Sequence, residues 1–440
     1  MNDTRKITFC TNTARNEINH TKLLFKSLEQ NLSRRDHEII VFIDSDNQGT
    51  FEWLLTQKET FPNLKILRNE LPICYGYARN INEMFEQASN DIVSYLQSDM
   101  VICKDYDLEV LKGLEPGMMV CSTRVEPPLH PDGPEKITKD FGLDPLTFDL
   151  EGWTEFAEQH KEDRWSMYFF APFTMYKREW LSVGGHDTIF RRSREDSDML
   201  IRMVLNGTKI VQTWRALAYH FTCTSSRGPN WFDKNNTAAQ ERLRVQQLAD
   251  QHELTRFTVL WGAFSHGALT PDGYIKQYYY NVAANMDLEG ADIQTVFPII
   301  EPFFTKVYVP EESFIEKMQE YYDSFHNAAN NLLNISDETW KEYGYMYNQL
   351  KAADRFKLAS EFVPGEDDIL ISFKLKDITN QLLNEFLVNL QHIIHENVDE
   401  PGAFEYGPFT ITVNRKIDRA PEKMVVVNPT VKPEHLYSIH

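Results

Sequence analysis

The sequence predicts an α/β protein whose main sheet is mostly parallel and carries helices on both faces, followed by a mainly helical α+β region. Apolar runs at residues 6–11, 38–43 and 92–102 have the uninterrupted hydrophobic character of buried strands. Helical patterns separate these runs, and strands that alternate with helices form parallel sheets covered on both faces. The chain has 440 residues and 42% hydrophobic content, which is enough for two domains.

Each element of the first half is predicted from its own pattern. The run over 92–102 is rich in β-branched and aromatic residues and predicts one buried strand, interrupted by Gln97, Ser98 and Asp99. Further strands are expected at 6–11, 38–43, 64–67, 166–176, 210–211 and 217–221. Helical spacing of apolar residues is found at 20–31, 50–60, 76–88, 177–183 and 195–206.

Two of the predicted strands are followed by acids. Asp44 comes directly after the second strand, and Asp99 interrupts the run at 92–102. The plain interpretation is a turn in which Ser98 or Asp99 caps the next element. However, a carboxylate at a buried strand end is costly to desolvate without a positive partner, and ligands bind at this end of open parallel sheets. With Arg79 between them in sequence, the two acids suggest a nucleotide and a hard divalent metal.

An irregular insertion follows at 124–165. Its prolines and glycine predict a loop, and residues 153–160 predict one short helix. An insertion this long is usually functional or mobile, so we consider it a candidate lid over the acceptor. Trp153, Phe156 and Trp165 could offer an apolar face to a substrate, or could equally pack the insertion onto the sheet.

A helix beginning near Glu195 carries three acids in its first turn: Glu195, Asp196 and Asp198. Acids are favoured at helix N-termini for electrostatic reasons, but three of them exceed what one cap requires. His220 lies inside an apolar run, where a histidine is more often a hydrogen-bonded core residue than a ligand. Residues 225–228 form a polar, basic loop suited to phosphate oxygens.

Composition limits the classes of function. The net charge is −20, and the acidity is concentrated after residue 250, where 28 acidic residues face 15 basic ones. This charge makes nucleic acid an unfavourable partner, although a local basic groove is compatible with it. Five scattered cysteines without a CxxC pair predict reduced core thiols. Neither a signal peptide nor an apolar run of membrane-spanning length is visible, so we expect a cytoplasmic protein.

We place a domain boundary between residues 235 and 236. The region 236–440 is predicted to be a mainly helical accessory domain whose role, in acceptor binding or in homo-oligomer formation, is a guess from its position alone. Helical patterns occur at 274–286, 311–334, 336–356 and 377–395, a strand is expected at 256–264, and residues 409–413 and 424–427 resemble a β pair.

The order of motifs over residues 6–231 resembles the family 2 glycosyltransferases of the GT-A type. The segments that carry the resemblance are FCTNTARNE, VFIDSDNQGT, GYARNIN, YLQSDM, GGHDTIF, REDSDMLIRMVLNG and AYHF, from residue 9 to residue 221. Each segment is weak alone, and seven in the right order are a strong signal. YLQSDM occupies the position of the family's Asp-x-Asp motif, and Gln97 stands where that motif has its first acid.

The resemblance implies a metal-dependent, inverting transfer of a sugar from a nucleoside diphosphate donor, such as a UDP- or GDP-sugar, to a hydroxyl of a glycan or another acceptor. Asp99 and His220 would bind Mn²⁺ or Mg²⁺. Asp196 would be the general base, and Glu195 would position the acceptor or the base. The donor would be held by Thr11, Thr13, Arg15, Asp44, Arg79, Ser98 and Arg227.

Two alternatives remain open at this point. A catalytically inactive GT-A domain that acts as a binding or assembly module is favoured by Gln97 and opposed by the intact Glu195 and Asp196 pair. A sugar nucleotidyltransferase shares the sheet but requires a glycine-rich basic loop after the first strand, which the segment TNTARNE lacks.

Overall fold

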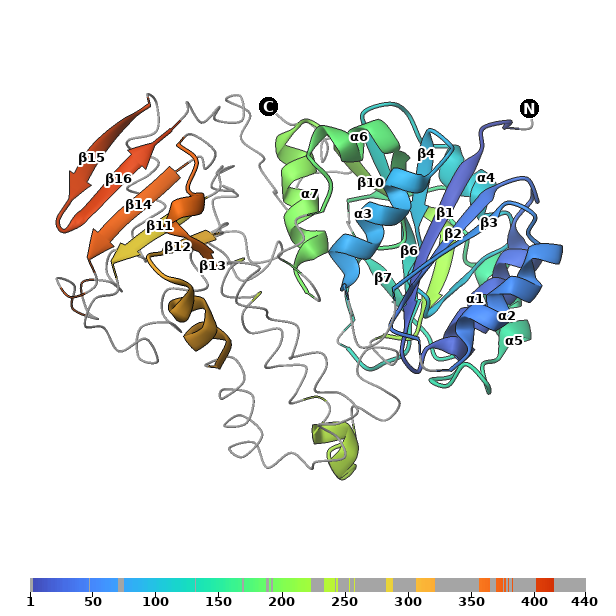
Figure 1. The fold of residues 1–440 in the computed structure, drawn as a ribbon. Coiled ribbons are helices and arrows are strands. Elements are labelled where there is room, and N and C mark those ends of the chain that lie inside the picture. The colour runs from blue at the N-terminus through green and yellow to red at the C-terminus, as the bar shows by residue number, and fades with distance from the viewer. Residues whose placement is uncertain are drawn as a thin grey trace. The chain divides into compact units, whose positions relative to one another are not determined.

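The computed structural model divides into two compact units, residues 1–243 and residues 244–423, each described by itself (Figure 1). The structure describes residues 3–222 apart from 47, 70–74, 131, 168–169, 187–189 and 191–192. It also describes residues 233–241, 243, 253, 257, 282–287, 306–320, 356–364, 369–374, 376, 379, 382 and 401–414. Within this part of the chain, no helix is both long and apolar enough to cross a membrane.

The first unit is built on a ten-stranded sheet in the order β3-β2-β1-β4-β9-β6-β10-β5, with β7 beside β6 and β8 beside β10. Strands β3, β2, β1 and β4 are parallel neighbours, and β6 and β10 are also parallel. The predicted mostly parallel sheet is therefore confirmed. The strands are β1 Ile7–Ala14, β2 Glu38–Asp44, β3 Leu64–Arg68, β4 Ile92–Tyr95, β5 Met100–Ile102, β6 Met118–Glu126, β7 Lys136–Thr138, β8 Trp165–Ser166, β9 Phe173–Tyr176 and β10 Lys209–His220.

Helices cover both faces of this sheet, because successive side chains of a strand point to opposite faces. Phe9 of β1 packs with α1, α2, α4 and α5, whereas its neighbour Cys10 packs with α3, α6 and α7. Both cores are made of large apolar side chains. The helices are α1 Ile18–Asn31, α2 Thr50–Thr56 (continued by a 3-10 turn, Gln57–Glu59), α3 Tyr77–Gln87, α4 Tyr106–Leu111, α5 Leu150–Gln159, α6 Lys177–Ser182 and α7 Glu195–Leu205.

Two predicted strands are each divided in the structure. The run at 92–102 forms β4 and β5, which lie in different parts of the sheet: β4 pairs with β1, and β5 pairs antiparallel with β10. The polar residues Gln97, Ser98 and Asp99 form the connection at which the chain leaves one strand and enters the other. The run at 166–176 likewise contributes β8 and β9.

The insertion at 124–165 is held on the sheet by its aromatic residues. Trp153 of α5 is fully buried, and its indole N–H points to the carbonyl oxygen of Ile102 at 3.4 Å. Phe141 contacts the rings of Trp153 and Tyr219, the latter on β10. Of the two interpretations of Trp153, packing onto the sheet is the correct one.

The second unit contains a six-stranded sheet in the order β13-β12-β11-β14-β16-β15. The strands are β11 Val282–Asp287, β12 Lys306–Val309, β13 Phe356–Leu358, β14 Ile369–Lys374, β15 Gly402–Tyr406 and β16 Phe409–Val413. The prediction of a helix at 274–286 is therefore wrong from residue 282, where a strand buried between two neighbours forms. β16 pairs with β14 and β15. Its expected partner at 424–427 lies outside the described residues, as do the strand expected at 256–264 (residue 257 apart) and most of the other helices expected in this region.

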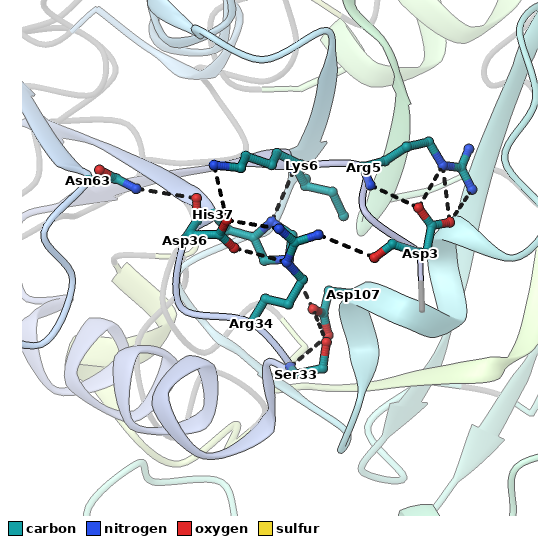
Figure 2. Close-up of polar contacts among 10 residues, drawn as sticks. Asp3, Arg5, Lys6, Ser33, Arg34, Asp36, His37, Asn63 and Asp107 are labelled. Carbon is teal, nitrogen blue, oxygen red and sulfur yellow. Dashed lines mark hydrogen bonds and ion pairs between the residues drawn. The ribbon is translucent and has the colours of Figure 1, made fainter. Parts of the chain in front are cut away.

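A buried polar cluster fixes the amino-terminal end of β1 (Figure 2). Asp107 of α4 accepts hydrogen bonds from the backbone and hydroxyl of Ser33 and from Nε2 of His37 at 2.9 Å. Nδ1 of His37 accepts the backbone N–H of Ile7, which assigns the proton to Nε2. Burial raises the pKa of Asp107, but the hydrogen bonds from His37 and Ser33 outweigh it and lower that pKa below its usual value.

We predict that Asp107→Asn lowers the free energy of unfolding by about 2 kcal/mol at neutral pH, because it leaves buried donors without a full set of acceptors. The pKa of Asp107 is lowered by folding, so its stabilisation is present above the unfolded-state pKa, about 4. It is lost as the pH falls through the lower folded-state value. The difference between wild type and variant should therefore shrink in acid, as measured by urea unfolding followed by tryptophan fluorescence.

The control is Asp36→Asn in the same cluster. The Asp36 side chain is 44% exposed and pairs with Arg34 and Lys6 at the surface, so its loss should change stability much less. Equal losses for the two variants would contradict the role given to Asp107.

Candidate functional site

The candidate site lies at the carboxyl ends of β1, β2 and β4. Asp44 is the last residue of β2, and Asp99 follows β4, on the two sides of β1. His220 is the last residue of β10 and pairs with Met100 of β5, which brings it beside Asp99. Sequence positions more than a hundred residues apart thus meet at one edge of the sheet, where ligands of such sheets bind.

His220 lies between two carboxylates. Its Nε2 faces Oδ1 of Asp99 at 3.7 Å, and its Nδ1 lies 2.8 Å from Oε1 of Glu126, the last residue of β6. The other oxygen of Glu126 is 3.0 Å from Nζ of Lys136 on β7. Burial raises the pKa of Glu126, but the His220 hydrogen bond and the neighbouring cations outweigh it and hold that pKa well below its usual range.

This arrangement fits a metal ion between Asp99 and His220. A ligating histidine typically donates its second ring N–H to a carboxylate, which fixes the tautomer and the ring orientation. Glu126 is placed to accept that proton, which leaves the Nε2 lone pair directed toward Asp99. In the described part of the chain, no three His, Cys, Asp or Glu side chains gather as a metal site. The protein would therefore supply two ligands, and diphosphate oxygens would supply others.

Other acidic groups converge on the same place around Tyr95, at the end of β4. Its hydroxyl donates to Oδ1 of Asn12. Burial raises the pKa of Tyr95 far above its usual value, and nearby acidic groups raise it further: Tyr77, Glu195, Asp99 and Glu17. These groups come from distant parts of the sequence: Tyr77 begins α3, Glu195 begins α7, and Asp99 and Glu17 lie in connections between elements.

The structure gives Asp44 a different set of partners from the expected nucleobase. Its two oxygens accept hydrogen bonds from the side chains of Asn69 and Asn80 and from the backbone N–H groups of Tyr75 and Gly76, at 2.5 to 2.9 Å. A carboxylate has about four acceptor positions, so these donors saturate it. Asp44 therefore holds the turn that begins α3, and we assign it this role in place of a direct contact with the base.

Arg79 lies in the first turn of the helix that Asp44 holds. Its guanidinium stacks 3.5 Å from the ring of Tyr75 and pairs with Glu83 at 3.0 Å. The side chain is about half exposed. It is consequently ordered by its neighbours while its charge remains accessible to a ligand.

The remaining expected donor residues divide into two groups. Thr13 and Ser98 are engaged within the protein: Thr13 bonds Thr21 of α1 at 2.7 Å, and Ser98 donates to Glu17 at 2.9 Å. Their contact with the nucleotide stays a prediction. Thr11 is buried on β1, and its hydroxyl has no hydrogen-bond partner among the residues that the structure describes. Arg15 follows the end of that strand. Arg227 lies outside the described residues.

The three acids of α7 have different environments. Asp198 is buried and pairs with Arg202 at 2.7 Å, so it is a structural residue. Asp196 is half-buried, and its Oδ1 accepts the backbone N–H and the hydroxyl of Ser197. No described residue donates to Oδ2 of Asp196. Oδ2 of Asp196 is therefore placed to accept a proton without losing a hydrogen bond to the described residues.

Sequence reasoning missed Glu17, Glu126 and Tyr95. Glu126 ends a buried strand, as Asp44 does, and the same signal of an acid at a strand end could have identified it. Glu17 lies within the segment FCTNTARNE but appeared to be one more polar loop residue. Nothing in the local pattern distinguishes Tyr95 from a core aromatic, because its surroundings come from elements distant in sequence.

Comparison with known proteins identifies the first part of the chain. Residues 13–185 match the model of glycosyl transferase family 2. None of the curated proteins matches the chain.

Among solved structures, S. aureus TarS aligns with a TM-score of 0.37 and 14% identity, over 58% of this chain and 45% of TarS. The mannosyltransferase PcManGT from Pyrobaculum calidifontis, in complex with GDP-Man and Mn²⁺, aligns with a TM-score of 0.38 and 17% identity, over 57% of this chain and 64% of that protein. GalNAc-T7 with UDP, GalNAc and Mn²⁺ aligns with a TM-score of 0.37 and 12% identity, over 55% and 54% of the two chains. This likeness is distant, and the family assignment rests on the sequence match.

We predict that Asp44→Ala unlocks the turn before α3. The variant leaves four donors without their acceptor, so we expect a loss of about 3 kcal/mol in the free energy of unfolding. Amide exchange at Tyr75 and Gly76 should become faster, because Asp44 accepts both N–H groups. Hydrogen exchange followed by mass spectrometry over residues 69–80 measures this. Glu83→Gln, which removes only the exposed pair with Arg79, is the control, and faster exchange in both variants would contradict the assignment.

Proposed function

We propose that this chain, whose residues 13–185 match the model of glycosyl transferase family 2, transfers a sugar from a nucleoside diphosphate donor to an acceptor hydroxyl, with inversion and with a divalent metal. The observation that carries the proposal is the buried series Lys136, Glu126, His220 and Asp99 at the carboxyl end of β4. His220 has a carboxylate on each side, at Nδ1 and at Nε2. In such a series His220 can bind a cation through Nε2, while the hydrogen bond between its Nδ1 and Glu126 fixes the orientation of the ring.

The donor would lie across the carboxyl ends of β1 and β4. Asp99 and His220 would hold Mn²⁺ or Mg²⁺, which would neutralise charge on the diphosphate of the donor. The accessible guanidinium of Arg79 is suited to the base or the diphosphate. Thr11 and Arg15, at the end of β1, are proposed to contact the nucleoside. The base is proposed to be uracil or guanine, and the acceptor a glycan or another molecule with a free hydroxyl.

Asp196 would act as the general base. In the reaction, the acceptor oxygen forms a bond to the anomeric carbon while the bond from that carbon to the diphosphate oxygen breaks. The acceptor proton passes to Oδ2 of Asp196, and the leaving diphosphate keeps the bonding electron pair. Attack from the face opposite the leaving group inverts the anomeric centre. The bond that Asp196 accepts from the backbone N–H of Ser197 fixes the carboxylate at the start of α7.

We predict that Asp196→Asn lowers the rate of transfer by about 10²-fold or more, while donor binding and thermal stability stay near wild type. Asn cannot accept the acceptor proton but preserves the shape of the side chain. The measurement is product formation from a panel of nucleotide sugars, with donor binding followed by calorimetry. Asp198→Asn is the contrasting variant, because loss of its buried pair with Arg202 should lower stability. An Asp196→Asn enzyme with full activity would remove Asp196 from the base role.

We predict that Glu126→Gln weakens Mn²⁺ binding about 10- to 100-fold, because a neutral amide supports the His220 ring less strongly. Asp99→Asn and His220→Ala should weaken it further. Titration of the electron paramagnetic resonance signal of free Mn²⁺, with UDP or GDP present, gives the affinity without relying on activity. Glu162→Gln removes an exposed pair with Arg164 in the same insertion and should leave the affinity unchanged. Wild-type affinity in the Asp99 and His220 variants would refute the proposed metal site.

A further inference from the structure

The sheet of the second unit repeats the strand arrangement of the first. Read across the sheet, the strands of the second unit lie in the order β13-β12-β11-β14-β16-β15. If the six strands are numbered along the chain, this order is third, second, first, fourth, sixth, fifth. In the first unit, β1, β2, β3, β4, β6 and β9 are arranged in the same way, as β3-β2-β1-β4-β9-β6. The directions also agree: the first four positions are parallel, and the next two pairings are antiparallel in both sheets.

Side chains at equivalent register positions agree as well. Ser94 of β4 pairs with Thr174 of β9, and Ser372 of β14 pairs with Thr410 of β16. In both units an aromatic residue follows the serine. The rings of Tyr95 and Phe173 have centroids 5.6 Å apart, and the rings of Phe373 and Phe409 have centroids 5.3 Å apart. The correspondence therefore extends from strand order to residue pairs between β4 and β9 in the first unit and between β14 and β16 in the second.

From these two observations we infer that the second unit is a second domain of the same nucleotide-binding type, with a binding site of its own for a nucleoside diphosphate at the carboxyl ends of β11 and β14. The strand order reverses between these two parallel strands, because β12 and β13 lie on one side of β11 while β14 and its neighbours lie on the other. Ligands of open α/β sheets bind at such a switch point. The corresponding strands of the first unit are β1 and β4, which carry the candidate donor site.

The charge at this position differs from that in the first unit. β14 ends in Lys374, which is exposed and lies in register with Asp287, the last residue of β11. An ammonium group at the switch point is suited to pair with phosphate oxygens. The equivalent position of the first unit is Leu96, which is buried. The second site would thus bind the diphosphate partly through a lysine.

The ligand class rests on the proposed function, since it is taken from the donor site of the first unit. The test is the stoichiometry of UDP and GDP binding to the full chain, each with Mn²⁺, by equilibrium dialysis. Two equivalents are expected for the wild type. Combined replacement of Asp99 by Asn and His220 by Ala should remove one equivalent and leave the other. Adding Lys374→Glu should weaken the remaining equivalent about tenfold or more.

Lys317→Glu is the matched control, because it makes the same charge change on an exposed helical residue of the second unit. Circular dichroism of each variant checks that the chain remains folded. One equivalent that disappears with the Asp99 and His220 replacements would overturn this inference and leave the proposed function intact. If the remaining equivalent of nucleotide binds equally well in the Lys374→Glu and Lys317→Glu variants, there is no binding site at β14. Absence of any binding by the wild type would refute the proposed function and this inference together.

Discussion

The desolvation of carboxylates at the carboxyl edge of the first sheet is the constraint on which the rest of the structure depends. Asp44, Glu126 and Asp99 are all buried there. A buried carboxylate is tolerated only with hydrogen-bond donors or positive charge around it. Asp44 receives four donors, two from the turn before α3, one from α3 and one from the residue after β3. Glu126 receives His220 and Lys136. Asp99 faces the imidazole of His220 at 3.7 Å.

The same constraint explains why the insertion at 124–165 belongs to the site. It contributes Lys136, which neutralises Glu126, and Glu126 in turn orients His220. Aromatic packing around Trp153 fixes the insertion on the sheet, so this ion pair is held in a buried setting rather than on a free loop. A buried pair with low exposure on both sides is far less screened than a surface pair. The orientation of the His220 ring at the edge of the sheet is therefore coupled to the aromatic packing around Trp153, tens of residues away in sequence.

The two sheets of the chain share one strand order but carry different residues at the end of the fourth strand. Each has four parallel strands followed by an antiparallel pair, and each places a serine and an aromatic ring at matching positions. The first ends its fourth strand beside an acid and a histidine, and the second ends it in a lysine. Strand order fixes where a ligand binds, whereas the residues at the strand ends fix which ligand is bound.

The sequence by itself determined the layered α/β architecture of the first unit, because buried parallel strands and amphipathic helices have distinct local periods. It also predicted Asp99 and the acids at the start of α7 as site residues, since polar residues next to apolar runs are visible locally, whereas His220 was predicted only through the family resemblance. Three features follow from the tertiary structure alone. Residues 92–102 form two strands, and Asp44 and Ser98 form hydrogen bonds within the protein. Glu126 lies within hydrogen-bond distance of Nδ1 of His220. These features depend on register and on hydrogen bonds between elements that are about a hundred residues or more apart in sequence, and no local pattern records which donor meets which acceptor.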